Sequence, residues 1–431
     1  MGAVRYAVLA LVVAGVVFRV VFGVVATSDQ VYGDALAFEQ YAQHLRHGDG
    51  YILTGLYEDG PSATHPPAFG GVLAAFSTVG LDTPRQHRLA LAVLGGLGVA
   101  LVGLLGRELA GNAVGLVAAA IVAFHPLWVV PGRALYSESV YLIVICAVLL
   151  LALRAVRRPR FCGFLALGVA TGIATLTRSE ALLLVVFVGL PAVFLSTGDR
   201  RGRASCTAAL LAGTLLIVAP WVVRNAVQLD GPALSTNTGV TLVGAYCGEM
   251  FQPGPRFGSW SVGCTFRQAG AVNRMYGPEP PVASDRRLVR RAIDLAQDRA
   301  RQLPSLIAAH VGRLWGFYHP GDQVTFEDRT THSHGLQTAG QYVHWALLAF
   351  VVLGIAFARP REWLLIAGPM LMVTVNAAVF YGSTRLRAGA EPSLALFAAV
   401  GIVWLATRRK PRPEDKGSNA LNHAGLAERT T

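Results

Sequence analysis

Charged residues are scarce in this 431-residue chain: Asp, Glu, Lys and Arg make up only 14%, whereas 53% of the residues are hydrophobic. A soluble globular domain carries about 25% charged residues, so the composition excludes an ordinary soluble protein. Lysine is nearly absent, since Lys410 and Lys416 are the only two. The 47 Gly and 22 Pro residues are scattered through long apolar runs, which argues against a disordered or collagen-like chain. The composition predicts a protein that crosses a membrane many times.

Apolar stretches of membrane-crossing length recur along the chain, each close to the roughly 20 residues that span a bilayer core. We predict an all-α polytopic membrane protein with about ten transmembrane helices. The predicted spans begin near Val4, Arg88, Ala113, Ser137, Phe161, Ala181, Ala204, Gln341, Trp363 and Glu391. A shorter apolar segment, Pro66 to Gly80, predicts an interfacial or re-entrant helix instead.

The arginines indicate the sidedness of this topology, because short cytoplasmic loops retain Lys and Arg. If the N-terminus is cytoplasmic, all the inner connections are basic: GRELAGN, RAVRRPR, STGDRRGR, ARPRE and the tail TRRKPRP. The net charge of +12 therefore reflects membrane topology, and we expect no nucleic-acid partner. The predicted location is the plasma membrane, the bacterial inner membrane, with any chemistry on the extracytoplasmic face.

This topology divides the chain into four parts. They are an N-terminal membrane module at 1–226 that includes an outer loop at 27–87, a large extracytoplasmic loop at 227–340, the last three spans at 341–407, and a basic cytoplasmic tail at 408–431. We expect the tail to be disordered. The large loop mixes eleven Arg with nine Asp and Glu, which predicts a folded cap rather than a nucleic-acid-binding patch.

The five cysteines fit this sidedness. Cys146, Cys162 and Cys206 lie in or beside spans, where a thiol behaves as a small apolar residue. Cys247 and Cys264 both lie in the large outer loop, where an oxidising compartment would let them form a disulfide. Two free thiols are the alternative.

An amphipathic helix is predicted to open at Asp34, directly after the first span. Apolar residues follow at helical spacing, at Phe38, Tyr41, Ala42 and Leu45, so this helix is expected to lie on the membrane surface. Asp34 then either caps the helix or presents an ionised carboxylate to the headgroup layer, and the two roles are compatible. Asp29 is a second carboxylate on the same stretch, but a pair at this spacing is weak evidence for a metal site.

Two further polar residues lie close to the first loop. Arg19 is inside the first span, where an arginine either points into a polar cavity or extends to the interface. His65 precedes two prolines at the entry of the short apolar helix. A single histidine is usually structural or solvated, so it predicts no site by itself.

Taken together, the outer segments resemble the polyprenyl-phosphate-sugar-dependent membrane glycosyltransferases of the GT-C superfamily, of the protein mannosyltransferase and aminoarabinose transferase type. The segments that carry the resemblance are YGDALAFEQYAQHL with Asp34, ATHPPAF with His65, LYSES with Glu138, LTRSEALLL with Arg178 and Glu180, PWVVRN with Arg224, LSTNTG with Asn237, and YGSTRLRAGAEP with Arg385, Arg387 and Glu391. Their order and their common outer placement are more specific than any one of them.

The resemblance implies a transferase that takes a sugar from a polyprenyl-phosphate carrier and passes it to a glycan, lipid or protein acceptor. By analogy with the family, Asp34 is the catalytic base, and attack on the opposite side of the sugar from the leaving phosphate predicts inversion at the anomeric carbon. Arg385 and Arg387 are the best candidates to bind the donor phosphate. His65 stands where the family has a lysine and is the third candidate to bind the donor phosphate. The resemblance also favours the disulfide between Cys247 and Cys264.

Supporting roles are expected for the other outer polar residues. Glu138 either orients sugar hydroxyls or pairs with an arginine, and Arg178 is expected to form a structural ion pair with Glu180. Asn237 either contacts substrate or forms a turn. Arg19, Asp29, Arg224 and Glu391 complete the set of candidate substrate-binding or supporting residues. We predict no metal ligands, and the sequence leaves open whether a divalent cation takes part.

Other classes of protein remain as alternatives. Ten spans and an intramembrane Arg19 would permit a secondary transporter, but no internal repeat with interrupted helices is evident. A lipid-linked glycan polymerase or ligase would share the large outer loop. A non-catalytic scaffold would not require Asp34.

Overall fold

The computed structural model describes residues 2–25, 27, 29–55, 59–196, 198–269, 279–358 and 361–408. It is almost entirely helical in these residues, with one short antiparallel pair of strands. The predicted basic tail lies outside the described residues, apart from Arg408 at the end of the last helix. The all-α polytopic fold predicted from the composition is confirmed.

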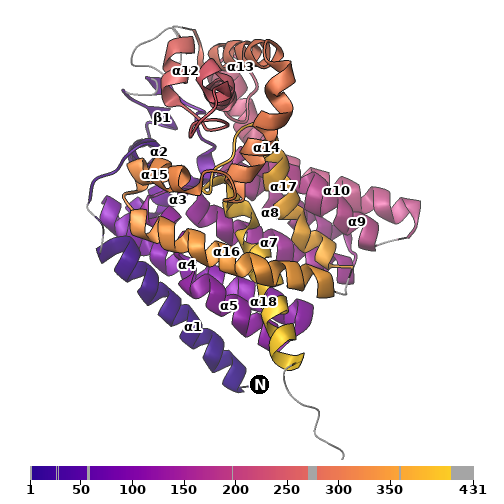
Figure 1. Ribbon diagram of the computed structural model, residues 1–431. Coiled ribbons are helices and arrows are strands. Elements are labelled where there is room, and N and C mark those ends of the chain that lie inside the picture. Colours follow the sequence, from indigo (N-terminus) through magenta and orange to yellow (C-terminus); the bar gives the residue numbers. More distant parts are fainter. Residues whose placement is uncertain are drawn as a thin grey trace, which may run out of the picture.

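Long apolar helices form the membrane part (Figure 1). Their bounds are α1 Gly2–Val20 with a π-helical turn Val21–Val25, α4 Pro84–Ala110, α5 Asn112–Phe124, α6 Val130–Arg133, α7 Glu138–Arg157, α8 Phe161–Thr177, α9 Leu190–Ser196, α10 Arg200–Gln228, α16 His334–Phe357, α17 Trp363–Val379 and α18 Glu391–Arg408. A 3-10 helix at Ser179–Leu183 and a π-helix at Val185–Gly189 lead into α9.

The predicted spans correspond to these helices one by one. Within the described residues, 7 helices are long and apolar enough to cross a membrane, and α5 with the segment Pro126–Arg133 forms a further candidate span bent by 71°. The two remaining predicted spans are α8 and α17, with 17 residues each. The short helix α3, Pro67–Thr78, matches the predicted interfacial or re-entrant segment.

Close approach between small residues lets the membrane helices pack. Gly168 on α8 lies against the backbone of α10 near Leu210, and Gly213 on α10 lies against α8 near Leu165. A side chain at either glycine would force the two helices apart. Small residues are the usual means of such packing in a bilayer, where apolar burial gives little net drive for helix association.

The first loop folds against the end of α10. It contains α2, Asp34–His47, the strands β1 Ile52–Leu53 and β2 Gly60–Pro61, and α3. Arg224 of α10 donates hydrogen bonds to the carbonyl oxygens of Tyr51, at 2.8 Å, and Ser62, at 2.7 Å. Its role in the structure is therefore to anchor this loop.

The large loop forms a helical cap over the same end of the membrane part (Figure 1). Its helices are α11 Thr238–Tyr246, α12 Val262–Ala269, α13 Pro281–Gln297, α14 Leu303–Leu314 and α15 Pro320–Thr331. A disulfide joins Cys247 to Cys264 next to buried Met250. It connects the end of α11 to α12.

Removing this disulfide is expected to loosen the cap without disrupting the spans. Serine at both Cys247 and Cys264 should cost the cap about 3 kcal/mol on the chain-entropy account of a short closed loop. The measurement is limited proteolysis of the purified protein, with fragments assigned by mass spectrometry. Faster cleavage between α11 and α13 is expected in the double variant, whereas an unchanged pattern would contradict the prediction. Serine at Cys162, an exposed free thiol outside the cap, is the control.

Candidate functional site

A cavity of about 540 Å³ lies between the membrane part and the cap. Asp34, Tyr136 and Arg385 line it from segments that adjoin the spans. Trp260 and Glu327 line it from the cap. A volume of this size is within the usual range for small-molecule sites.

The backbone before α2 positions Asp34 in this cavity. Gly33 has φ 56° and ψ −131°, a conformation that a side chain would strain, and it packs against Thr330 of α15. Gly33 occupies the N-cap position and Asp34 is the first helical residue, so the prediction that Asp34 is the N-cap residue is wrong. Its Oδ2 lies 2.8 Å from Nη2 of Arg385, and its side chain remains 28% exposed.

Arg385 is the centre of a chain of ion pairs. Its Nε donates to Glu138, and its guanidinium lies 3.8 Å from the centre of the Tyr136 ring. Glu138, which is fully buried, also accepts from Nη1 of Arg178 at 2.5 Å, and Arg178 donates in turn to Glu180. Alternating charges fix the geometry of each guanidinium, and two carboxylates restrain Arg385.

This arrangement keeps Asp34 ionised. Burial is the largest single effect and raises the pKa of Asp34, but the charge of Arg385, the charges of His65 and Arg178, and the hydrogen bond from Arg385 together outweigh it, so the pKa lies below its ordinary value. The carboxylate is therefore negative at neutral pH and has oxygen lone pairs available to accept a proton.

His65 also faces Asp34, with Nε2 3.7 Å from Oδ1. Burial lowers the pKa of His65, and the charge of Asp34 only partly opposes this effect, so the imidazole is neutral at pH 7. The ring packs on Phe38 with 4.7 Å between centroids. His65 is thus beside the carboxylate, and it adds positive charge there only when its imidazole is protonated.

Glu327 was missed by the sequence analysis. It is buried at the cavity wall, and its Oε1 accepts from Oγ of Ser383 at 2.5 Å. Burial raises the pKa of Glu327, while the charge of Arg385 works against this rise. Its segment, EDRTT in the large loop, has no apolar periodicity, and only its excess of charge in a membrane protein singles it out.

Aromatic side chains on the cavity wall were also missed. Trp260 and Tyr381 stack with 6.0 Å between ring centroids, and Phe326 meets Trp260 edge-on at 6.5 Å. They come from three segments that are far apart in sequence. Such a wall offers flat apolar surface beside the charged floor, which suits a ligand with both polar and apolar faces.

Arg387 lies elsewhere, although it is only two residues from Arg385. It is fully buried in the 3-10 turn Leu386–Ala390, and its Nε donates to Glu391 at 2.9 Å. Its Nη1 donates to the carbonyl oxygen of Leu314 at 3.1 Å. The expectation that Arg387 binds donor phosphate finds no support in this geometry, because the side chain is inside the protein and does not line the cavity.

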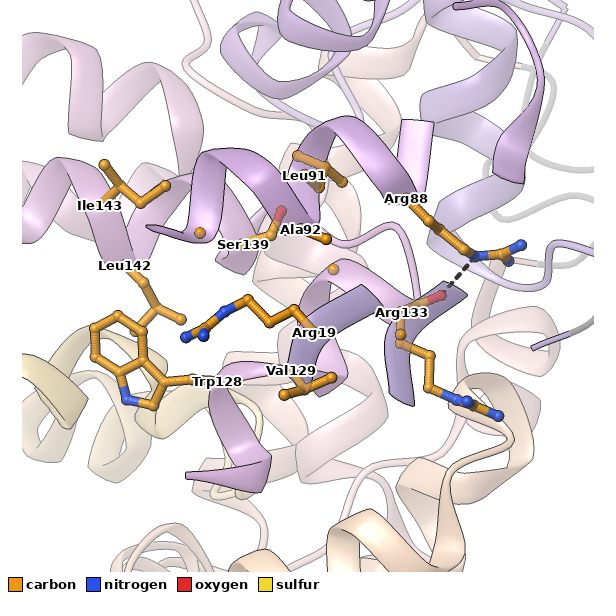
Figure 2. Close-up of a pocket in the computed structure, with 13 residues that line it drawn as sticks. Arg19, Arg88, Leu91, Ala92, Trp128, Val129, Arg133, Ser139, Leu142 and Ile143 are labelled. Atoms are coloured by element: carbon orange, nitrogen blue, oxygen red, sulfur yellow. Dashed lines mark hydrogen bonds between the residues drawn. The ribbon is translucent and has the colours of Figure 1, made fainter. Parts of the chain in front are cut away.

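Arg19 is likewise held within the helices. Its side chain is buried and donates to the carbonyl oxygens of Gly15, Val122 and Ala123 at 2.9, 2.8 and 3.2 Å. Figure 2 shows it extending toward Trp128 in a narrow pocket between α1, α4 and α6. Of the two expected orientations, the structure therefore has the inward one. The guanidinium is held by hydrogen bonds to backbone carbonyl oxygens and does not face an open polar cavity.

The last two candidates differ in position. Asn237 lines the cavity at the start of α11, and its backbone N–H donates to Oγ of Ser235 at 3.1 Å. Asp29 is exposed and does not line the cavity. Among the described residues, no three His, Cys, Asp or Glu side chains are grouped closely enough to hold a metal ion.

Comparison with known families supports the resemblance noted in the sequence. Residues 64–223 match the family model for dolichyl-phosphate-mannose-protein mannosyltransferases, which are membrane glycosyltransferases of the GT-C type. This confirms the predicted resemblance. The matched region contains His65, Glu138 and Arg178, whereas Asp34 and Arg385 lie outside it. No curated protein matches the chain.

The chain is also similar to solved structures, and the match to AglB supports the fold. The archaeal oligosaccharyltransferase AglB from Archaeoglobus fulgidus, in complex with an inhibitory peptide and a dolichol-phosphate, is 13% identical with a TM-score of 0.56; the match covers 94% of this chain and 51% of AglB. ArnT from Cupriavidus metallidurans, bound to undecaprenyl phosphate, is 18% identical with a TM-score of 0.41 over 96% of this chain and 81% of ArnT. This chain thus spans about half the length of the oligosaccharyltransferase.

Proposed function

We propose that this protein is a membrane glycosyltransferase that moves a sugar from a polyprenyl-phosphate carrier to an acceptor hydroxyl. The observation that carries the proposal is the ionised carboxylate of Asp34, paired with Arg385 at the floor of the cavity between the spans and the cap. A base and a phosphate-binding cation are thereby adjacent, next to the helix ends where a lipid-anchored phosphate is held.

In the proposed reaction, Asp34 takes the proton of the acceptor hydroxyl as the oxygen attacks the anomeric carbon of the sugar. The bond from that carbon to the phosphate oxygen breaks, and the lipid phosphate leaves with the electron pair. We further propose that the hydroxyl attacks from the side of the sugar opposite to the leaving phosphate, which inverts the anomeric configuration.

Arg385 stabilises the leaving phosphate, on which negative charge grows during the reaction. Its planar fork can donate two parallel hydrogen bonds to phosphate oxygens. As the phosphate draws Arg385 toward itself, the pair with Asp34 weakens and Asp34 becomes a stronger base. Donor binding would then activate the base at the moment when it is needed.

We propose that the donor is a polyprenyl-phosphate sugar and that the acceptor is a glycan, lipid or protein. Support for the donor comes from the family match over residues 64–223 and from AglB, a solved neighbour in complex with dolichol-phosphate. We further propose that the cavity faces the extracytoplasmic side of the bacterial inner membrane, because the connections at the other end of the spans are the basic ones. On this view residues 227–340 form the cap over the substrate.

The position of the cavity favours a transferase over a secondary transporter. Transporter sites lie near the bilayer midplane between broken helices. Here the cavity is lined by residues of the cap and of segments that adjoin the spans, and the cap lies over one end of the membrane helices (Figure 1). A polymerase or ligase that uses a lipid-linked glycan is also compatible with this position. The size of the donor that the protein accepts distinguishes such an enzyme from the proposed transferase.

The experiment is transfer of labelled sugar in membranes that contain the full-length protein. Donors are polyprenyl-phosphate monosaccharides and, separately, polyprenyl-linked oligosaccharides, each with and without added Mg²⁺ or Mn²⁺. Transfer or donor hydrolysis from a monosaccharide donor supports the proposal. Reaction with oligosaccharide donors alone would indicate a polymerase or ligase, and absence of reaction with all donors would overturn the proposal.

A further inference from the structure

A second cavity, of about 480 Å³, lies at the opposite end of the spans. Helix α7 connects the two regions, because it begins at Glu138 beside the first site and ends at Arg157 in the wall of the second. A helix of 20 residues is about 30 Å long, so the second cavity is at the other face of the membrane. It is independent of the proposed transferase site.

Arginines dominate the wall of this cavity, and glutamates neutralise only two of them. Arg154 donates to Glu108 at 2.9 Å, and Arg157 donates to both oxygens of Glu362 at 3.0 and 2.8 Å.

The other two arginines, Arg158 and Arg160, are exposed, and neither makes an ion pair or a side-chain hydrogen bond within the described part of the chain. The cavity therefore carries a surplus of two positive charges, which an anion can neutralise.

The wall also has an apolar part that extends toward the membrane interior. Leu151 and Ala155 lie at i and i+4 on one face of α7, and Arg158 follows as the residue directly after the helix, so the wall has an apolar stripe with a charged end. A free phosphate would use only the charged end of this stripe. An amphiphile would use both parts, with its phosphate at the arginines and its glycerol and acyl carbons along the partly exposed Leu151.

Helix α8 adds to the attraction for an anion. It begins at Phe161 directly after Arg160, and no side chain caps its first N–H groups. The positive end of its dipole thus lies beside the two arginines that lack carboxylate partners. The surplus positive charge by itself indicates an anionic ligand. The N-terminus of α8 adds to the attraction for that anion.

We propose that this cavity binds the headgroup of an anionic phospholipid, with Arg158 and Arg160 on the phosphate. Basic pockets between spans, at headgroup depth, are suited to such lipids. Arginine forks match phosphate oxygens. The lipid would bridge α7 and α8 at the face opposite the cap.

The test uses purified full-length protein and two double variants. Arg158→Gln with Arg160→Gln removes the surplus charge of the cavity. Arg200→Gln with Arg201→Gln is the matched control, because these exposed arginines begin α10 after a neighbouring connection at the same face and do not line the cavity. Binding is measured by native mass spectrometry and by thermal shift with phosphatidylglycerol, phosphatidylcholine and inorganic phosphate.

We expect the wild type and the control to bind phosphatidylglycerol about tenfold more tightly than phosphatidylcholine, and the cavity variant to lose this preference. Single variants at Arg158 and Arg160, each expected to lose about threefold, serve if the double variant does not fold. If the control variant lost the preference for phosphatidylglycerol to the same extent, the preference would come from general surface charge, and the proposal would be overturned. Saturation by inorganic phosphate with no gain from the lipid would also overturn it.

Discussion

The substitution Asp34→Asn is expected to lower the rate of sugar transfer by about 100-fold or more while leaving the protein folded. A positioned general base contributes roughly 10² to 10⁴ in rate, and an amide of the same shape cannot accept the proton. The loss should be in kcat rather than in KM for the donor, because Arg385 remains to bind the phosphate. Initial rates of transfer in membranes, at matched protein levels, measure the effect.

The matched control is Asp29→Asn. Both carboxylates follow the first span and lie five residues apart, and only the family resemblance favours Asp34 over Asp29 in the sequence. The structure separates them, since Asp34 lies in the cavity beside Arg385 and Asp29 is exposed outside it. The control should transfer at close to the wild-type rate. If Asp34→Asn retained a tenth or more of the activity, or if both variants lost it equally, Asp34 would not be the base.

The spans could be predicted because their signal is local. A run of apolar residues long enough for the bilayer is visible in the sequence without knowledge of what it packs against. The helix that follows the first span was equally accessible, since Phe38, Tyr41 and Ala42 recur at helical spacing and are buried in the structure. Even the start of that helix, at Asp34, agrees with the structure.

The site could be predicted only in part, because its residues meet through tertiary structure. Glu138 and Arg385 are separated by 247 positions, yet they form an ion pair. Arg385 and Arg387 belong to one short motif, but the 3-10 turn between them sends one side chain to Asp34 and the other into the core. Glu327 has little local signal beyond the charge of its segment, because its partner Ser383 is 56 positions away, in the connection between α17 and α18.

The substitution Arg385→Lys is expected to lower the rate of sugar transfer by about 100-fold while preserving the fold. The substitution keeps a positive charge near Asp34 and Glu138 but removes the planar fork that holds both carboxylates and, in the proposed reaction, the leaving phosphate. Removal of one preorganised donor from a developing anion costs roughly 10² to 10³ in kcat. Transfer rates and the thermal midpoint of the purified variant are both needed.

Arg387→Lys is the matched control, and it should show the opposite pattern. This residue forms a fully buried pair with Glu391, so loss of its geometry is expected to destabilise the protein by about 3 kcal/mol. At a temperature where the variant is still folded, its transfer rate should remain close to that of the wild type, because the side chain does not line the cavity. Two arginines of one motif would then be separated by function: Arg385 acts on the reaction, and Arg387 acts on the fold. A full transfer rate in Arg385→Lys, or a loss of rate in Arg387→Lys without a lower thermal midpoint, would contradict this assignment.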